Sequence, residues 1–115
     1  MEKINMGLTK KDIFNAQAGK GFKDAAKEAV TGMLTGFAVT EVEDIDYSTG
    51  ELKGNKTVCV MKVGGMIYSG ESIVVARRLT EMANMFTEEE IGAGIEIQFT
   101  EIKAGRGTAT NFMLV

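Results

Sequence analysis

The chain has 115 residues, enough for one domain with its own hydrophobic core and too few for two. Hydrophobic residues make up 44% and charged residues 25%, the formal net charge is −3, and histidine is absent. A chain without histidine lacks the usual general base, the commonest metal ligand and the partner of a serine or cysteine nucleophile. We therefore expect no enzyme, no metal site and no cofactor.

The first predicted strand covers residues 33–42, where apolar and polar side chains alternate. Met33, Phe37 and Val39 are expected on one face of this strand. Gly36 interrupts the alternation, which indicates a bulge or bend of the kind that a small barrel needs at its corners.

Two further strands are predicted after a polar run. Residues 56–63 alternate in the same way, and the pair Gly64-Gly65 that follows is a two-residue hairpin signal. Residues 66–69 are therefore expected to return beside them as a brief third strand. The single cysteine, Cys59, lies within the second strand and is expected to act as a small buried hydrophobe.

One helix is predicted from Ser72 to about Phe86. Ser72 is a preferred N-cap residue, and apolar side chains recur at helical spacing after it. Residues 88–90, Glu-Glu-Glu, come next. Consecutive residues on a helix point in different directions, so this run predicts a solvated junction rather than a metal cluster. Residues 95–100 and 108–115 predict two final strands.

The predicted order is thus three strands, one helix and two strands. This order is typical of the oligonucleotide/oligosaccharide-binding (OB) architecture, a mainly β, five-stranded Greek-key barrel with one helix between strands 3 and 4. We expect a single domain over residues 1–115, in which residues 33–115 form the OB-like barrel and residues 1–32 an N-terminal segment. Such a barrel uses its outer sheet face for binding, which favours a binding function.

Three glycine-flanked segments are candidates for functional loops, and a turn is the simplest interpretation of each. The segment of residues 19–23, Gly-Lys-Gly-Phe-Lys, has the most functional weight. It does not match a nucleotide-binding P-loop. Its aromatic residue, Phe22, lies between Lys20 and Lys23, an arrangement that single-strand binders use to stack a base and hold the flanking phosphates. The alternative is that Phe22 fills the core.

Residues 13–24, Ile-Phe-Asn-Ala-Gln-Ala-Gly-Lys-Gly-Phe-Lys-Asp, resemble a stretch of the single-stranded DNA-binding proteins of phi29-like bacteriophages. The likeness continues at residues 67–69, Ile-Tyr-Ser, and from the Gly-Arg-Gly-Thr turn at residues 105–108 to Asn-Phe at residues 111–112. The resemblance implies a small, abundant, acidic viral protein that coats the strand displaced during protein-primed DNA replication. Residues 25–30 depart from the family pattern, because alanine and glutamate favour a short helix where relatives tend to have a Pro-Gly turn.

The candidate DNA contacts are aromatic residues that stack bases and cations that bind phosphates. Stacking on an aromatic side chain is worth roughly 1–3 kcal/mol per base and is nearly indifferent to sequence. Tyr68 is the favoured platform, because it lies in the third strand and matches the family; Tyr47, in an acidic loop, and Phe22 are the others. The candidate phosphate contacts are Lys20, Lys23, Lys53, Lys56, Lys62 and Arg106.

The distribution of charge bears on this prediction. Residues 1–30 contain six lysines and four acidic residues, whereas the remainder contains seven basic and twelve acidic residues. A net negative charge argues against nucleic-acid binding, which usually leaves a basic footprint. The phage proteins that the chain resembles are themselves acidic, and an acidic chain can present a locally positive groove.

We therefore expect a non-enzymatic protein that binds single-stranded DNA without sequence preference, with self-association along the strand as a further expectation. The alternative is a small β-barrel that docks a protein partner through an exposed strand edge or its N-terminal segment and binds no nucleic acid. The sequence shows no membrane-length apolar run, no secretory h-region at its start and one cysteine. These features predict a cytoplasmic protein without membrane contact, in the host cell cytoplasm if a phage encodes it.

Overall fold

The computed structural model describes residues 4–115, except for the side chains of Gln17 and Ala104. Its elements, in chain order, are β1 (Ile4–Met6), α1 (Lys10–Asn15), the 3₁₀ helix η1 (Ala16–Ala18), β2 (Lys20–Gly21), α2 (Phe22–Lys27), β3 (Thr31–Ile45), β4 (Leu52–Val63), β5 (Met66–Gly70), α3 (Ile73–Met85), α4 (Glu88–Ala93), β6 (Ile95–Ala104) and β7 (Gly107–Leu114). None of these helices is long and apolar enough to cross a membrane.

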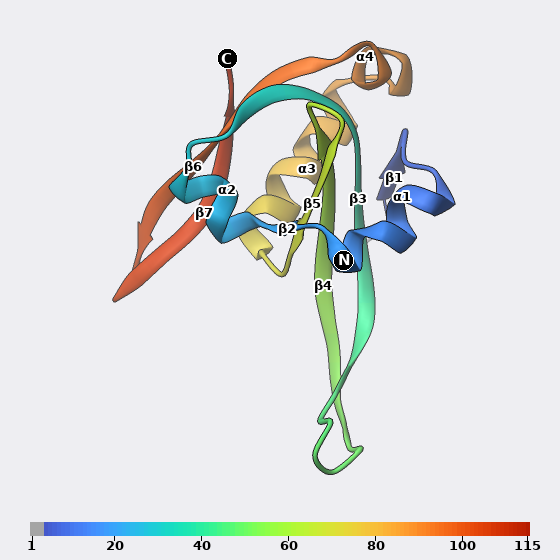
Figure 1. Ribbon diagram of the computed structural model, residues 1–115, viewed down its shortest axis with the longest axis vertical. Helices are drawn as coiled ribbons and strands as arrows, with labels where there is room; N and C mark the ends of the chain where they lie inside the picture. The colour runs from blue at the N-terminus through green and yellow to red at the C-terminus, as the bar shows by residue number, and fades with distance from the viewer. Residues whose placement is uncertain (1–3) are drawn as a thin grey trace.

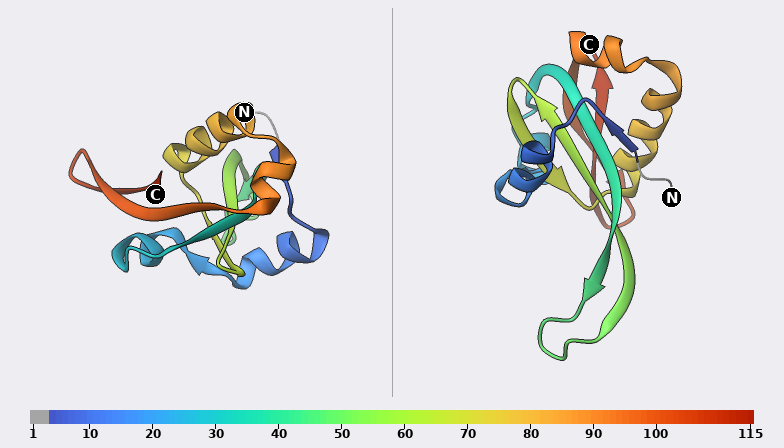
Figure 2. Two further views of the ribbon diagram at one scale, coloured as in Figure 1. Left: turned by 90° about the horizontal axis from the view of Figure 1, so that it is seen from above. Right: turned by 90° about the vertical axis from the view of Figure 1, so that its right-hand side faces the viewer.

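The strands form one curled sheet with the shape of a half-barrel (Figures 1 and 2), which confirms the prediction of a mainly β fold. Strand order in the sheet is β2-β5-β4-β3-β6-β7, and β1 pairs with β3. The pairing of β2 with β5 is parallel, and the other pairs are antiparallel. In the described pairing β7 is at one end of the sheet and β2 at the other, so β5 and β7 do not pair with each other.

The predicted strands and helix are present, and the strands are longer than expected. The ladder between β3 and β4 continues to the pair Ile45–Leu52, through a segment whose polar composition had indicated a loop. Pairing with the neighbouring strands stops earlier, because β1 pairs with β3 only as far as Val39 and β5 pairs with β4 only as far as Cys59. Residues 40–58 therefore project from the sheet as a two-stranded ribbon, here called the arm (Figure 1).

A bulge in β3 changes which side chains enter the core. The register of β3 against β4 shifts between Leu34 and Gly36, as the glycine had indicated. Leu34 and Phe37 are fully buried after the shift, whereas Met33 is 44% exposed, so the prediction that Met33 shares a face with Phe37 is wrong. A side chain at position 36 would lie 2.9 Å from Leu8, so the close approach of the N-terminal segment requires glycine there.

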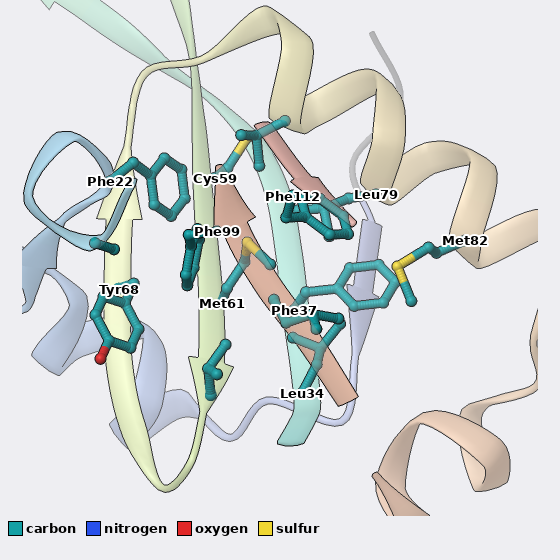
Figure 3. Packing of buried hydrophobic residues seen from close by; sticks show 14 of the residues in the cluster. Phe22, Leu34, Phe37, Cys59, Met61, Tyr68, Leu79, Met82, Phe99 and Phe112 are labelled. Atoms are coloured by element: carbon teal, nitrogen blue, oxygen red, sulfur yellow. The ribbon is translucent and has the colours of Figure 1, made fainter. Parts of the chain in front are cut away.

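The core lies between the concave side of the sheet and α3 (Figure 3). Ser72 caps α3 by accepting a hydrogen bond from the backbone N–H of Val75, at 3.1 Å, as predicted. Cys59 is fully buried, and burial raises its pKa to about 11, which confirms its expected role as a small hydrophobe. The largest fully buried side chains of the core are Phe37, Phe99, Phe112, Leu34, Met61, Leu79, Ile91 and Ile97.

The N-terminal segment is part of the sheet. Within residues 19–23, Lys20 and Gly21 form the short strand β2 and Phe22 begins α2, so this segment is not the turn that its glycines indicate. A side chain at Gly19 would lie 2.7 Å from the carbonyl oxygen of Ile67, so glycine lets β2 approach β5. The hydroxyl of Ser69 donates a hydrogen bond to the carbonyl of Ala16, at 2.8 Å, and fixes η1 to the same strand.

Candidate nucleic-acid interface

Phe22 and Tyr68 lie in the core and are not exposed platforms. Their exposed fractions are 4% and 3%, and both rings pack against Phe99, with centroid distances of 6.0 Å for Phe22 and 5.2 Å for Tyr68. Figure 3 shows the three rings on one side of the cluster. The prediction that Tyr68 and Phe22 stack bases therefore does not hold in this structure, because each ring is already covered by core side chains.

Phe22 instead fixes the position of the lysines beside it. The Phe22 ring fills the space between β5 and Phe99, so α2 is held where β5 and β7 fail to meet. Lys20 and Lys23, on either side of it, are exposed. Neither lysine has an ion-pair partner within the part of the chain that the structure describes. Their positive charges are therefore available to an anionic ligand.

Two adjoining cavities follow the end of β5, and together they are here called the β5 groove. The first, of about 560 Å³, lies between α2, the start of α3 and the free edge of β7. The second, of about 500 Å³, lies between the end of β5 and the arm. Both are lined by Ser69, Gly70 and Glu71, so they adjoin at these three residues. Each volume is within the range of about 300–1,000 Å³ that is usual for ligand sites.

Some of the predicted residues line the groove and the others do not. Phe22 and Lys23 line the first cavity, and Tyr47 and Lys56 line the second. Tyr47 is 98% exposed. These residues come from α2 and from the arm, and the curl of the sheet brings them to one groove. The predicted residues that do not line it are Lys20, Lys53, Lys62, Tyr68 and Arg106.

Ion pairs neutralise the lysines of β4. Lys53 lies 3.8 Å from Asp46 and Lys62 lies 3.5 Å from Asp12, so each has a carboxylate partner away from the groove. These pairs reduce the case for Lys53 and Lys62 as phosphate contacts. Arg106 is exposed at the turn between β6 and β7 and has no ion-pair partner among the described residues.

Lys56 and Glu71 form an ion pair inside the groove. Lys56 Nζ lies 2.8 Å from Glu71 Oε1, and the hydrogen bond to this carboxylate raises the pKa of Lys56. Glu71 lines both cavities, so its negative charge lies where the two cavities meet. An anionic ligand that reaches Lys56 must compete with Glu71 for it.

Sequence patterns did not indicate Glu71, nor Thr108 and Thr110, which line the first cavity from β7. Thr108 and Thr110 reach the groove only because β7 curls toward the end of β5, and no local sequence pattern predicts this curl. Among the residues that the structure describes, no cluster of three or more histidine, cysteine or acidic side chains could hold a metal ion. The groove offers cations, hydroxyl groups and one exposed aromatic ring.

Comparison with known protein families, with curated proteins and with solved structures gave no significant match to this chain.

Proposed function

We propose that this protein binds single-stranded DNA, without sequence preference and without catalysis, in the β5 groove. The observation that carries the proposal is that the two cavities meet at Ser69, Gly70 and Glu71, with the unpaired Lys23 lining one and the exposed Tyr47 lining the other. A basic groove with accessible aromatic rings is the usual way in which proteins hold single strands. Coating of displaced strands during phage DNA replication is part of the proposal and rests on the resemblance of residues 13–24.

We also propose that β3, β4, β5, β6 and β7 correspond to the five strands of an OB-like barrel. The pairings β3–β4, β4–β5, β3–β6 and β6–β7, and the position of α3 between β5 and β6 in the chain, support this assignment. The barrel is open between β5 and β7, where α2 lies. On this view the β5 groove is the opening of the barrel.

In the proposed mechanism, Lys23 binds a phosphate at one end of the groove, and Lys20, which is exposed just outside this end, binds the next phosphate of the strand. Lys56 binds a further phosphate when that phosphate displaces the carboxylate of Glu71. A base stacks on the ring of Tyr47 at the other end of the groove. Because stacking does not depend on base identity, this arrangement gives little sequence preference. The carboxylates of Glu43 and Glu71 in the groove keep the affinity moderate, and the lysine–phosphate contacts make the binding sensitive to salt.

A titration tests this function. The protein is mixed with an oligo-dT of about thirty nucleotides at a low and a high salt concentration, and tyrosine fluorescence is recorded. Tyr47 is fully accessible and Tyr68 is covered by the core, so stacking should quench the Tyr47 component. Quenching that weakens as salt increases supports the proposal. No change at low salt, in fluorescence or in the mobility of a labelled oligonucleotide, would refute it.

A protein-interaction module is the second candidate, and the arm is the observation that favours it. Apolar side chains are exposed along the arm, at Val42, Ile45 and Leu52, and a two-stranded ribbon without a third strand beside it is only marginally stable. A protein partner would order this ribbon. Loss of oligonucleotide binding together with retention of a protein partner by the arm would favour this function over the first.

A further inference from the structure

Phe14 is an exposed aromatic residue outside the β5 groove, and no sequence pattern had assigned it a role. It lies on α1 and is 79% exposed. The ring does not contribute to the core clusters formed by the described residues. A large apolar side chain that is free of the core and accessible to solvent is available to a ligand.

The ring of Phe14 has two lysines beside it. Lys10 and Lys11 lie four and three residues before Phe14, the spacings that place side chains on one face of a helix. Both lysines are exposed, and neither has an ion-pair partner in the described part of the chain. An aromatic ring with cations on the same face matches the pattern by which single strands are stacked and neutralised.

The one acidic residue of α1 does not compensate these lysines. Asp12 accepts a hydrogen bond from the backbone N–H of Thr9, at 3.0 Å, and its other carboxylate oxygen lies 3.5 Å from Lys62 Nζ. The hydrogen bond from Thr9 is the main cause that lowers the pKa of Asp12, so the carboxylate stays charged and engaged in the capping box. Lys10 and Lys11 therefore keep their net positive charge.

The other side of this segment is anchored to the sheet, so the position of Phe14 is fixed. Leu8 and Ala16, before and after α1, are buried against Ala38 of β3 and Val60 of β4. A short helix would be marginal by itself, but this packing and the capping box stabilise it. Anchored in this way, α1 presents Phe14 without a conformational change.

The segment from α1 to α2 connects Phe14 to the lysines at the groove. In Figure 1 this segment crosses in front of β4 and β5, from α1 on the right to α2 on the left. The lysines along it are Lys10, Lys11, Lys20, Lys23 and Lys27, and the acidic residues between them are Asp12 and Asp24. A chain of phosphates that leaves the groove at Lys23 meets positive charge along this path.

We propose that Phe14, Lys10 and Lys11 form a second contact site for the same single strand, in which a base stacks on Phe14 and the lysines bind the flanking phosphates. This inference rests on the proposed function and extends its footprint beyond the β5 groove. The unpaired lysines favour a nucleic acid over a protein as the ligand of this surface. The strand then contacts the protein on both the groove and the α1 side.

The first test compares Phe14→Ala with Met85→Ala, which removes another exposed apolar side chain, 73% exposed, from α3. Affinity for an oligo-dT of about thirty nucleotides is measured by fluorescence anisotropy of a labelled strand. Phe14→Ala should weaken binding about tenfold and Met85→Ala should not change it. Neither side chain is in the core, so thermal unfolding should be unchanged in both variants.

The second test places a reporter at the site. Phe14→Tyr in a Tyr47→Phe background keeps the ring and makes its fluorescence report on stacking; added oligo-dT should quench it beyond the Tyr47→Phe parent. The double variant Lys10→Gln/Lys11→Gln should reduce the slope of log affinity against log salt by about 0.7 per lysine, and Arg77→Gln on α3 should leave it unchanged.

The outcomes separate the two proposals. If the parent binds and neither Phe14→Ala nor the double lysine variant weakens it, the second site is refuted and the groove stands. If Phe14→Ala weakens binding but the reporter is not quenched, stacking at Phe14 is refuted. If the parent does not bind oligo-dT at low salt, both proposals are refuted.

Discussion

The ring of Phe22 lies against the backbone of Gly70, so closely that a Cβ on Gly70 would be 2.7 Å from Phe22 Cδ2. This contact fits α2 to the end of β5 and sets the floor of the β5 groove. We expect Gly70→Ala to displace the ring and to reduce the free energy of unfolding by about 1–3 kcal/mol, the usual cost of overpacking. Urea unfolding of the variant and of the parent measures this difference in the free energy of unfolding.

The matched control for that substitution is Gly92→Ala. Gly92 is in α4, and a Cβ there would contact nothing within 4 Å. Alanine favours helix over glycine by roughly 1 kcal/mol, so this variant should be as stable as the parent or more stable. A Gly70→Ala protein with the stability of Gly92→Ala would contradict the tight fit between Phe22 and Gly70.

Tyr68 should affect stability and not DNA contact. The side chain is buried against Phe99, so Tyr68→Ala should reduce the free energy of unfolding by about 3–5 kcal/mol, as for other large aromatic residues. Tyr68→Phe keeps the ring and should bind oligo-dT as the parent does. If a fully folded Tyr68→Phe protein bound oligo-dT more weakly than the parent, Tyr68 would have to contact the DNA, contrary to this prediction.

Glu71 should limit the affinity of the groove. Its carboxylate holds Lys56 at 2.8 Å, so Glu71→Gln releases this cation and removes a negative charge from the groove. We expect tighter binding of oligo-dT by several-fold and a steeper dependence on salt. Glu89→Gln, on the exposed first turn of α4, changes net charge equally and is the control. Equal effects of the two variants would mean that only net charge matters.

Cys59 should make stability depend on pH in the alkaline range. Burial raises its pKa from 9.0 to about 11, so above pH 9 the thiol ionises in the unfolded chain before it does in the folded one. Its contribution to stability is therefore complete below pH 9 and is lost as pH rises toward 11. Chemical unfolding over this range should show a smaller loss for Cys59→Ala than for the parent. Identical pH profiles would contradict the buried position of the thiol.

Hydrophobic periodicity was sufficient to predict most strands and α3, because alternation and helical spacing are local properties. It could not predict β1 or β2, which are too short to show a period. Gly36 indicated a bulge in β3. Whether this bulge turns Met33 away from the face of Phe37 depends on the position of the extra residue, which periodicity does not give.

The site was harder to predict for a different reason. Alternation separates Tyr68 from Ile67 but does not say which face of β5 is covered, and α2, through Phe22, covers the face of Tyr68. For Phe14 the sequence does contain a usable pattern, because Lys10, Lys11 and Phe14 are spaced to share one helix face. For Glu71 it contains none, because its partner Lys56 is on a neighbouring strand.

The most direct test of the central claim is the salt dependence of oligo-dT binding by the parent and by the double variant Lys20→Gln/Lys23→Gln. Both lysines are exposed and have no ion-pair partners among the described residues, so the variant should fold normally. If the β5 groove holds the strand, binding weakens and the slope of log affinity against log salt falls by about 0.7 for each lysine. An unchanged affinity and slope would contradict the groove as the DNA-binding site.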